Sequence, residues 1–368
     1  MPVVLTGLTA DLFYCICVYC GWSTALELYR ASKALYLHWT SMSSQFVMAV
    51  QSTVVTVGCA YTEHADTANW DRLTLWTAFG SDKLISVQAP RPRFNSACVF
   101  DGARRIFILG GENKETEDVE ESEAVGVAVD SFDLVVGVWT LEADMLTSRS
   151  DFAASCMLNE LIAIGGTNEY DDVLDSVDVC GLGAGSWQAR TCLAEARYNF
   201  ALANMGSDVF VIGGLTDIGD IVATIEVLSD QGRTIRTLTS VPEPVTGCMA
   251  TVRGAKLILI GGQMGDRLSD SARVQEFDTT TLSWAELELL PLEMSNALHF
   301  RSESRIHVFG GNQSEGVANA IDDVEAILNE RTGQWITRPS PWNVAFGAAV
   351  WLDFSSANCQ YDVQRSTG

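Results

Sequence analysis

The chain has 368 residues, of which 47% are hydrophobic and 19% are charged, so it can bury a large core and is not globally disordered. Its 23 basic and 47 acidic residues give a net charge of −24. This argues against a protein that binds nucleic acid or an anionic membrane surface, because both need clustered Lys and Arg. The apolar run at residues 12–22 is about half as long as a bilayer span and follows no Lys or Arg, so neither a membrane span nor a signal peptide is predicted.

Ten cysteines are spread along the chain, too thinly for the disulfide scaffold of a small secreted protein. Cys98, Cys156 and Cys248 lie inside apolar runs, where a reduced cysteine behaves as a small hydrophobic residue. A reducing compartment fits this usage. The predicted location is therefore the cytoplasm, with the nucleus as the alternative.

Short apolar runs that end in glycine recur along the chain. From residue 58 onward their first glycines are 48 to 55 residues apart, and a further unit is predicted around Gly21. Five runs end in Gly-Gly, whereas two units have Gly21–Trp22 and Gly58–Cys59 instead. The first glycines of the seven units are Gly21, Gly58, Gly110, Gly165, Gly213, Gly261 and Gly310.

Each unit has the same internal order: a strand with small residues, a turn, the apolar run, a polar loop, and two further strands. The third strand alternates, as at residues 177–179, and the fourth carries tryptophan at Trp139, Trp187, Trp284 and Trp335. Four short strands in about 50 residues, with a diglycine, describe one blade of a β-propeller. Because blades stack face to face, the strand before the diglycine is predicted to be buried on both faces.

These elements resemble the kelch repeat, and the resemblance covers nearly the whole chain. Arg149 and Arg197, each about ten residues after a tryptophan, also match that pattern, whereas Leu84 and Ile235 stand where tryptophan is expected. The resemblance implies an all-β, kelch-type β-propeller in which residues 1–368 form a single domain of four-stranded blades. Seven blades are predicted, with six as the alternative.

The ring is predicted to close by pairing of terminal strands, because closure removes exposed sheet edges. The run at residues 346–354 resembles a first strand with no unit behind it, and it is predicted to complete the N-terminal blade. Residues 3–8 are the alternative source of the closing strand.

No catalytic motif is found. His299 and His307 are expected on adjacent strands, but a metal site needs one or two further ligands. Cys17 and Cys20 have redox spacing without a second pair, and they are predicted to be core thiols. The sequence therefore predicts no catalytic residue, no cofactor and no metal.

In kelch-like substrate adaptors the binding face is formed by the loops after the diglycine and by the residues that lead into each first strand. The leading residues here are Asn95, Asp151, Asn199 and Asn296. The resemblance implies these partner-binding residues: Asn113, Asp151, Asn168, Tyr170, Asn199, Asp217, Gln263, Arg267 and Asn312.

Most of these positions hold Asn or Asp, so a neutral or basic protein partner is expected rather than an acidic one. Tyr170 is the best aromatic anchor. Arg149 and Arg197 are expected to be structural, with ligand contact as the alternative. The acidic run at 112–123 is interpreted as a solvated loop, with a flexible arm for a basic partner as the alternative.

The predicted function is a non-enzymatic protein-interaction module. The resemblance implies substrate recognition for a cullin-type ubiquitin ligase, or cytoskeletal (actin) binding. The alternative is a kelch-type enzyme that acts on a small molecule, such as a sugar isomerase or a specifier protein. That alternative requires convergent ionisable residues at the central channel, and the sequence does not assemble such a set.

Overall fold

The computed structural model describes residues 53–58, 72–77, 83–91, 93, 95–112, 125–134, 137–302, 304–311, 324–339 and 347–351. In this part the chain is all-β, with one short 3-10 helix, η2 (Val125–Val127). No helix within these ranges has the length and apolarity needed to cross a bilayer. The predicted unit around Gly21, the alternative closing strand at residues 3–8, and Cys17 and Cys20 lie outside the described residues.

Six antiparallel sheets have four strands each, and we number them by their place along the chain. Sheets 1 to 3 contain β27 (Gly347–Trp351), β1 (Thr53–Gly58), β2 (Arg72–Thr77) and β3 (Lys83–Gln88); β4 (Ala97–Phe100), β5 (Arg105–Leu109), β6 (Val129–Asp133) and β7 (Val138–Leu141); and β8 (Ala153–Met157), β9 (Glu160–Ile164), β10 (Ser176–Gly181) and β11 (Gln188–Cys192). Sheets 4 to 6 contain β12 (Ala201–Met205), β13 (Asp208–Ile212), β14 (Thr224–Ser229) and β15 (Thr234–Ser240); β17 (Met249–Arg253), β18 (Lys256–Ile260), β21 (Val274–Asp278) and β22 (Ser283–Glu286); and β23 (Leu298–Ser302), β24 (Arg305–Phe309), β25 (Val324–Asn329) and β26 (Gln334–Pro339).

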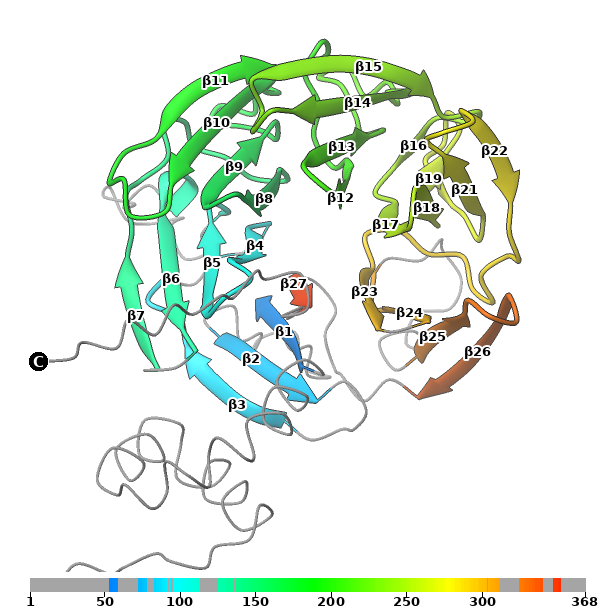
Figure 1. Ribbon diagram of the computed structural model, residues 1–368, viewed down its shortest axis with the longest axis horizontal. Helices are drawn as coiled ribbons and strands as arrows, with labels where there is room; N and C mark the ends of the chain where they lie inside the picture. Colours follow the sequence, from blue (N-terminus) through cyan, green and yellow to red (C-terminus); the bar gives the residue numbers. More distant parts are fainter. Residues whose placement is uncertain are drawn as a thin grey trace, which may run out of the picture.

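The sheets are arranged around a common centre, with β4, β8, β12, β17 and β23 nearest to it (Figure 1). In sheets 2 to 6 the strands follow one another outward in chain order. A small three-stranded sheet of β16 (Val245–Thr246), β19 (Gln263–Met264) and β20 (Ser269–Asp270) accompanies sheet 5. This arrangement is consistent with a β-propeller.

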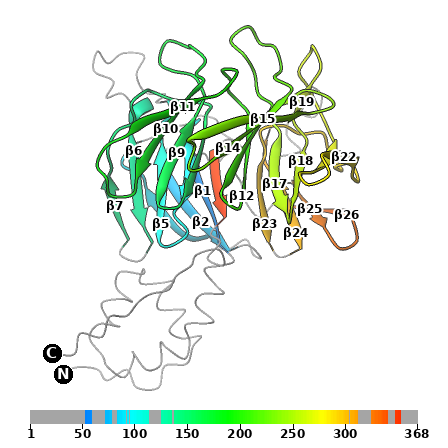
Figure 2. The ribbon, with the colours of Figure 1, turned by 45° about the horizontal axis from the view of Figure 1, so that its top comes forward.

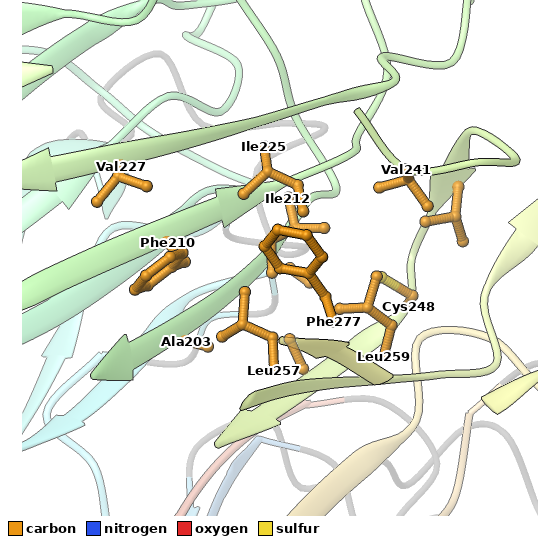
Figure 3. Close-up of a cluster of buried hydrophobic side chains, with 13 residues drawn as sticks. Ala203, Phe210, Ile212, Ile225, Val227, Val241, Cys248, Leu257, Leu259 and Phe277 are labelled. Carbon is orange, nitrogen blue, oxygen red and sulfur yellow. The ribbon is translucent and has the colours of Figure 1, made fainter. Parts of the chain in front are cut away.

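The second strand of each of sheets 2 to 6 is buried on both faces, as predicted, because it has a neighbouring sheet on either side. In β5, β9, β13, β18 and β24 all four residues after the first are buried. Between sheets 4 and 5, Phe210 and Ile212 pack against Leu257, Leu259 and residues of the linker (Figure 3). Similar apolar layers lie between sheets 2 and 3, between sheets 3 and 4, and between sheets 5 and 6.

The tryptophans of the fourth strands have two kinds of environment. Trp187 is 5% exposed, and its indole N–H donates to the carbonyl of Ala143, 2.9 Å away in the linker that leaves sheet 2. Trp335 likewise donates to Glu288 O at 3.0 Å. Trp139 and Trp284 are half-buried and lie beside phenylalanines of their own sheets, and Trp284 also packs against the core between sheets 4 and 5. Packing between sheets is therefore found for Trp187, Trp284 and Trp335.

The described cysteines are Cys98, Cys156, Cys180, Cys192 and Cys248, and all five are free thiols. Cys248 belongs to the core between sheets 4 and 5. Burial raises the pKa of Cys156 and of Cys248 to about 12. These thiols stay protonated at neutral pH, which agrees with their predicted role as small apolar residues.

β27 pairs with β1, with Gly347 opposite Gly58 and Ala348 opposite Val57. This corrects one prediction, because the C-terminal strand was expected in the unit around Gly21 and instead joins the unit that ends at Gly58. The physical reason is that β1 holds the second-strand position, whose inner edge needs a partner. β27 takes the first-strand position beside β1, and it contacts β4 on one side and β23 on the other.

Candidate functional site

The diglycine loops and the linkers into the first strands lie side by side at one end of the sheets, as the sequence predicted. Isolated bridges join Ser150 to Thr167 and Tyr198 to Leu215, in each case a linker residue to the residue after a diglycine. β16 and β19 repeat this pairing in sheet 5. β19 lies at the upper end of the sheets in Figure 2, and we call this end the diglycine face.

Five linker residues form a chain of backbone hydrogen bonds at the diglycine face. The N–H of Asp151 donates to Asn95 O (3.2 Å), that of Asn199 to Asp151 O (3.0 Å), and that of Asn296 to the carbonyl of residue 247 (2.8 Å). Gly247 completes the chain, because its N–H donates to Asn199 O at 2.9 Å. We call these residues the axial belt: Asn95, Asp151, Asn199, Gly247 and Asn296.

The backbone conformation of the belt explains its composition. All five residues have φ between 49° and 56°. Among residues with a side chain, Asn and Asp accept this left-handed conformation best, and glycine accepts it freely. This backbone requirement therefore places polar side chains from successive linkers along the belt.

The side chains of the belt meet in two groups. Asn95 Nδ2 donates to Asp151 Oδ2 at 3.1 Å. A Cβ on Gly247 would lie 2.5 Å from Asn296 Oδ1 and 3.3 Å from Asn199 Nδ2, so both amides reach over this glycine. Burial, together with the nearby charge of Glu112, raises the pKa of Asp151 to about 6, although the hydrogen bond from Asn95 opposes the shift.

Three buried arginines lie two residues before belt residues. Arg149 donates to Gly165 O and to Asp178 Oδ2, both at 2.7 Å, and so ties the linker to the second and third strands of its sheet. Arg197 makes the equivalent ion pair with Glu226, and Arg93 with Asp130. Arg149 and Arg197 have no exposed area. Their structural role is therefore confirmed, since a ligand at the surface has no access to them.

Sheets 5 and 6 lack this ion pair at both of its positions. In the next two linkers, Val245 and Met294 hold the position of Arg149 and Arg197. The equivalence follows from the backbone, because the carbonyl oxygen of each of these residues accepts the N–H of the second glycine of a diglycine. Opposite them in the third strands stand Gln275 and Ala326 in place of the acid. Arginine and acid are absent together, as expected because an unpaired buried charge is costly.

Two exposed apolar residues stand at the tips of equivalent loops on the diglycine face. Tyr170 is 76% exposed and Ile218 is 77% exposed. Their turns have the same geometry, with the amide of Asp171 donating to Asn168 O and that of Gly219 to Thr216 O, both at 3.1 Å. Exposed acids surround each tip: Glu169, Asp171 and Asp172 at the first, and Asp217 and Asp220 at the second.

The seven described residues of the predicted binding set lie at the diglycine face, but their environments differ. Asp151 and Asn199 lie in the axial belt, whereas Asp217 and Arg267 are exposed on loops. Two of the predicted residues hold their own loops. Asn168 Oδ1 accepts the amides of Tyr170 and Asp172, both at 2.9 Å.

Gln263 is the other predicted residue that holds its own loop, because its Nε2 donates to Asp270 Oδ1 at 3.1 Å. Asn113 and Asn312 lie outside the described residues. Sequence reasoning missed Ile218, because an isolated isoleucine in a polar loop gives no functional signal.

The two C-terminal histidines lie on adjacent strands, as predicted, with His299 on β23 and His307 on β24, but their imidazoles do not meet. His299 Nε2 lies 2.9 Å from Ala250 O, whereas His307 Nδ1 lies 2.6 Å from Glu325 Oε1. His299 is opposite Val308 in the ladder and Phe300 is opposite His307, so the two imidazoles point to opposite faces. Within the described ranges, no group of three or more His, Cys, Asp or Glu is placed to hold a metal ion.

No protein-family model matches the chain, and no curated protein matches its sequence. Among solved structures, one described as "Structure of YjhT" is similar, with a TM-score of 0.61 over 73% of this chain and 91% of that chain. The sequences are 14% identical, so the likeness concerns the fold alone. Together with the six four-stranded sheets it supports the β-propeller architecture, and the kelch resemblance stays a prediction from the repeat pattern.

Proposed function

We propose that this protein is a non-enzymatic binding module whose diglycine face docks a basic protein partner. The observation that carries the proposal is the pair of apolar tips, Tyr170 and Ile218, which are exposed on equivalent loops of adjacent sheets. An aromatic or aliphatic side chain that is held in a fixed turn and exposed to water is suited to bury area in an interface.

Charge supports a basic partner. The chain carries −24 overall, and the acids around each tip repel an acidic surface. A partner with Lys or Arg beside an apolar recess would match both the tips and their surroundings. The kelch resemblance supports two contexts for such binding: substrate recognition for a cullin-type ubiquitin ligase, and binding to actin.

The experiment selects a displayed peptide library on the wild-type protein. We expect enrichment of peptides in which Lys or Arg flanks a large apolar residue, with binding that weakens as salt is raised. The Tyr170→Ala/Ile218→Ala double variant should lose these peptides. The control is Leu158→Ala/Leu282→Ala, which removes two exposed apolar side chains from the turns at the opposite end of the sheets. Equal binding by both variants would show that the tips are not the docking site.

One observation favours the alternative class, an enzyme that acts on a small molecule. The pKa of Asp151 is raised to about 6 beside a second acid, Glu112, and perturbed carboxyls of this kind serve as proton donors or acceptors in catalytic sites. A metabolite screen by thermal shift separates the classes. A stabilising metabolite whose effect requires Asp151, in a protein that selects no peptides, would favour the enzyme.

We further propose that the ring has six blades and is closed by β27. Its support is the innermost position of β27, with β1 as its ladder partner and with β4 and β23 on either side. Seven blades, with a unit around Gly21, stay the competing prediction.

A further inference from the structure

At the end of the sheets opposite the diglycine face, one turn carries leucine where the equivalent turns carry glycine. We call this end, the lower one in Figure 2, the hairpin end. Leu158 opens the two-residue turn between β8 and β9, and Gly206 and Gly254 hold the same place in sheets 4 and 5. All three have positive φ, 51° for the leucine and 63° for each glycine. Glycine adopts this conformation freely, whereas leucine adopts it at a cost, and Leu158 is also 65% exposed.

A second leucine repeats this exchange in sheet 5. The N–H of Leu282 donates to the carbonyl of Asp278 at 2.8 Å, and Gly137 and Gly333 make the equivalent bond in sheets 2 and 6 at the same distance. Leu282 has φ 55° and is 53% exposed. Neither the backbone nor the burial of apolar area favours leucine at these two places. An exposed apolar side chain on a strained turn therefore points to contact with another surface.

The charged side chains of the hairpin end are layered, with cations toward the solvent and acids beneath them. Arg104 has 53% of its side chain exposed, against 13% for its partner Asp133. In three further pairs the cation is at least 31% exposed and the acid at most 6%: Arg253–Glu276, Lys256–Glu276 and Arg301–Glu330. Arg233–Asp230 is an exception, since both members are exposed. The charge that this end presents to solvent is therefore mainly positive.

Two more arginines of sheet 6 add to this positive charge. Arg305 and Arg331 are exposed and make no ion pair with a residue of the described ranges, whereas Asp208 and Asp278, two further acids of this end, are half-buried. The acids of the diglycine face lie about one strand away, roughly 17 Å for a five-residue strand, and charges in water are screened over about 8 Å at physiological salt. The net charge of −24 therefore does not describe this end, and the argument from it against an anionic membrane surface does not apply here.

We propose that the hairpin end binds an anionic lipid surface. Leu158 and Leu282 insert among the headgroups, and the exposed cations face the anionic lipids. A lipid surface fits better than the groove of a protein, because the leucines stand on sheets 3 and 5 with sheet 4 between them, and the cations are spread over sheets 2, 4, 5 and 6. That spacing suits a flat surface of diffuse charge. The inference does not depend on the proposed function, since the diglycine face points away from the membrane and stays open to a protein partner.

The test measures co-sedimentation of the full chain with vesicles of phosphatidylcholine alone or with about 30% phosphatidylserine. We expect the wild-type protein to bind the anionic vesicles at least about tenfold more tightly, and to lose this preference as salt is raised to about 0.5 M. Leu158→Gly/Leu282→Gly should weaken binding to the anionic vesicles by about tenfold or more, because it removes the inserted groups. Glycine is the residue of the equivalent turns, so the melting temperature should stay the same or rise, and the loss is then not due to unfolding.

The matched control is Leu146→Ala/Leu289→Ala, which removes two leucines of similar exposure from linkers at the diglycine end. It should change vesicle binding less than about twofold. The cations are tested with Arg305→Gln/Arg331→Gln, which should weaken binding to the anionic vesicles about tenfold and leave binding to phosphatidylcholine unchanged.

Three outcomes would overturn the inference: equal affinity for the two kinds of vesicle, unchanged binding in either hairpin-end variant, or no binding by the wild-type protein at about 1 mM lipid. If poly-glutamate binds through the same two arginines and the vesicles do not bind, the hairpin end takes an acidic protein and the lipid proposal is wrong. The peptide selection reports on the diglycine face alone, so its failure and the failure of vesicle binding are told apart.

Discussion

Replacing Asp151 by asparagine should stabilise the protein at neutral pH. In the folded chain burial and Glu112 raise the pKa of this carboxyl from 3.8 to about 6. Ionisation is therefore less favourable in the folded state than in the unfolded state. The raised pKa costs no stability below about pH 4, where Asp151 is protonated in both the folded and the unfolded state. It lowers the free energy of unfolding by its full amount above about pH 6, where Asp151 is ionised in both states.

The size of the effect follows from the shift in pKa. A shift of about two units corresponds to roughly 3 kcal/mol at most, and partial exposure of the side chain lowers this to about 1–3 kcal/mol. Asparagine has nearly the same shape, tolerates the left-handed backbone at this position, and keeps an oxygen for the hydrogen bond from Asn95. It removes the charge alone.

Urea unfolding of the wild-type protein and of Asp151→Asn should be compared at about pH 4.5 and about pH 7.5. We expect the variant to be more stable by about 1–3 kcal/mol at the higher pH and by much less at the lower one. Glu112→Gln should give a smaller gain, because its charge is only the second cause of the raised pKa. A variant that is less stable than wild type at pH 7.5, or a gap that does not change with pH, would refute this reasoning.

Four further predictions concern the scaffold, and each is measured as a change in the free energy of unfolding or in solubility. Gly213→Ala should cost several kcal/mol, because the added Cβ would lie 2.0 Å from Val245 O and the residue has φ +66°. The control Gly206→Ala has a similar φ of +63° but nothing within 4 Å of the added Cβ, so it should cost only about 1–2 kcal/mol, and equal losses would contradict the crowding at Gly213. Arg197→Val should cost about 3–5 kcal/mol, whereas the double variant Arg197→Val/Glu226→Gln should cost much less, because Val245 and Gln275 hold the same two positions in the next sheet. If the losses of the two single variants add up in the double variant, Arg197 and Glu226 are not coupled. Trp187→Ala should cost about 3–5 kcal/mol, and an unchanged melting temperature would refute its role between sheets. Deleting the chain from Ala345 onward should cause unfolding or aggregation, because β1 loses its inner partner; a soluble and equally stable truncation would refute closure by β27.

The architecture could be predicted because its physical requirements repeat. A strand between two sheets must be apolar on both faces, and the turn after it must accept positive φ, so five units show an apolar run before Gly-Gly. The position of β27 was not predictable in the same way. Its pairing with β1 joins distant parts of the chain, and the apolar patterns of both strands fit more than one partner.

The site could be predicted in part. The positions of Asp151 and Asn199 followed from their place before a first strand. Gly247 gave no sign of belonging to the same belt, because a glycine has no polar side chain and only its backbone takes part. The buried ion pairs could have been found by comparing units, since Arg197 and Glu226 are replaced together by Val245 and Gln275 in the next sheet.

The pairing of β27 with β1 also decides how the protein responds to tension. Val54 is opposite Trp351, so the start of β1 and the end of β27 lie at the same end of the ladder. A force that pulls these two strand ends apart loads the ladder's hydrogen bonds one after another, as a zipper is opened, instead of all together as in shear. Sheet 1 should therefore peel open at low force while sheets 2 to 6, whose ladders are local in the chain, keep their strands paired.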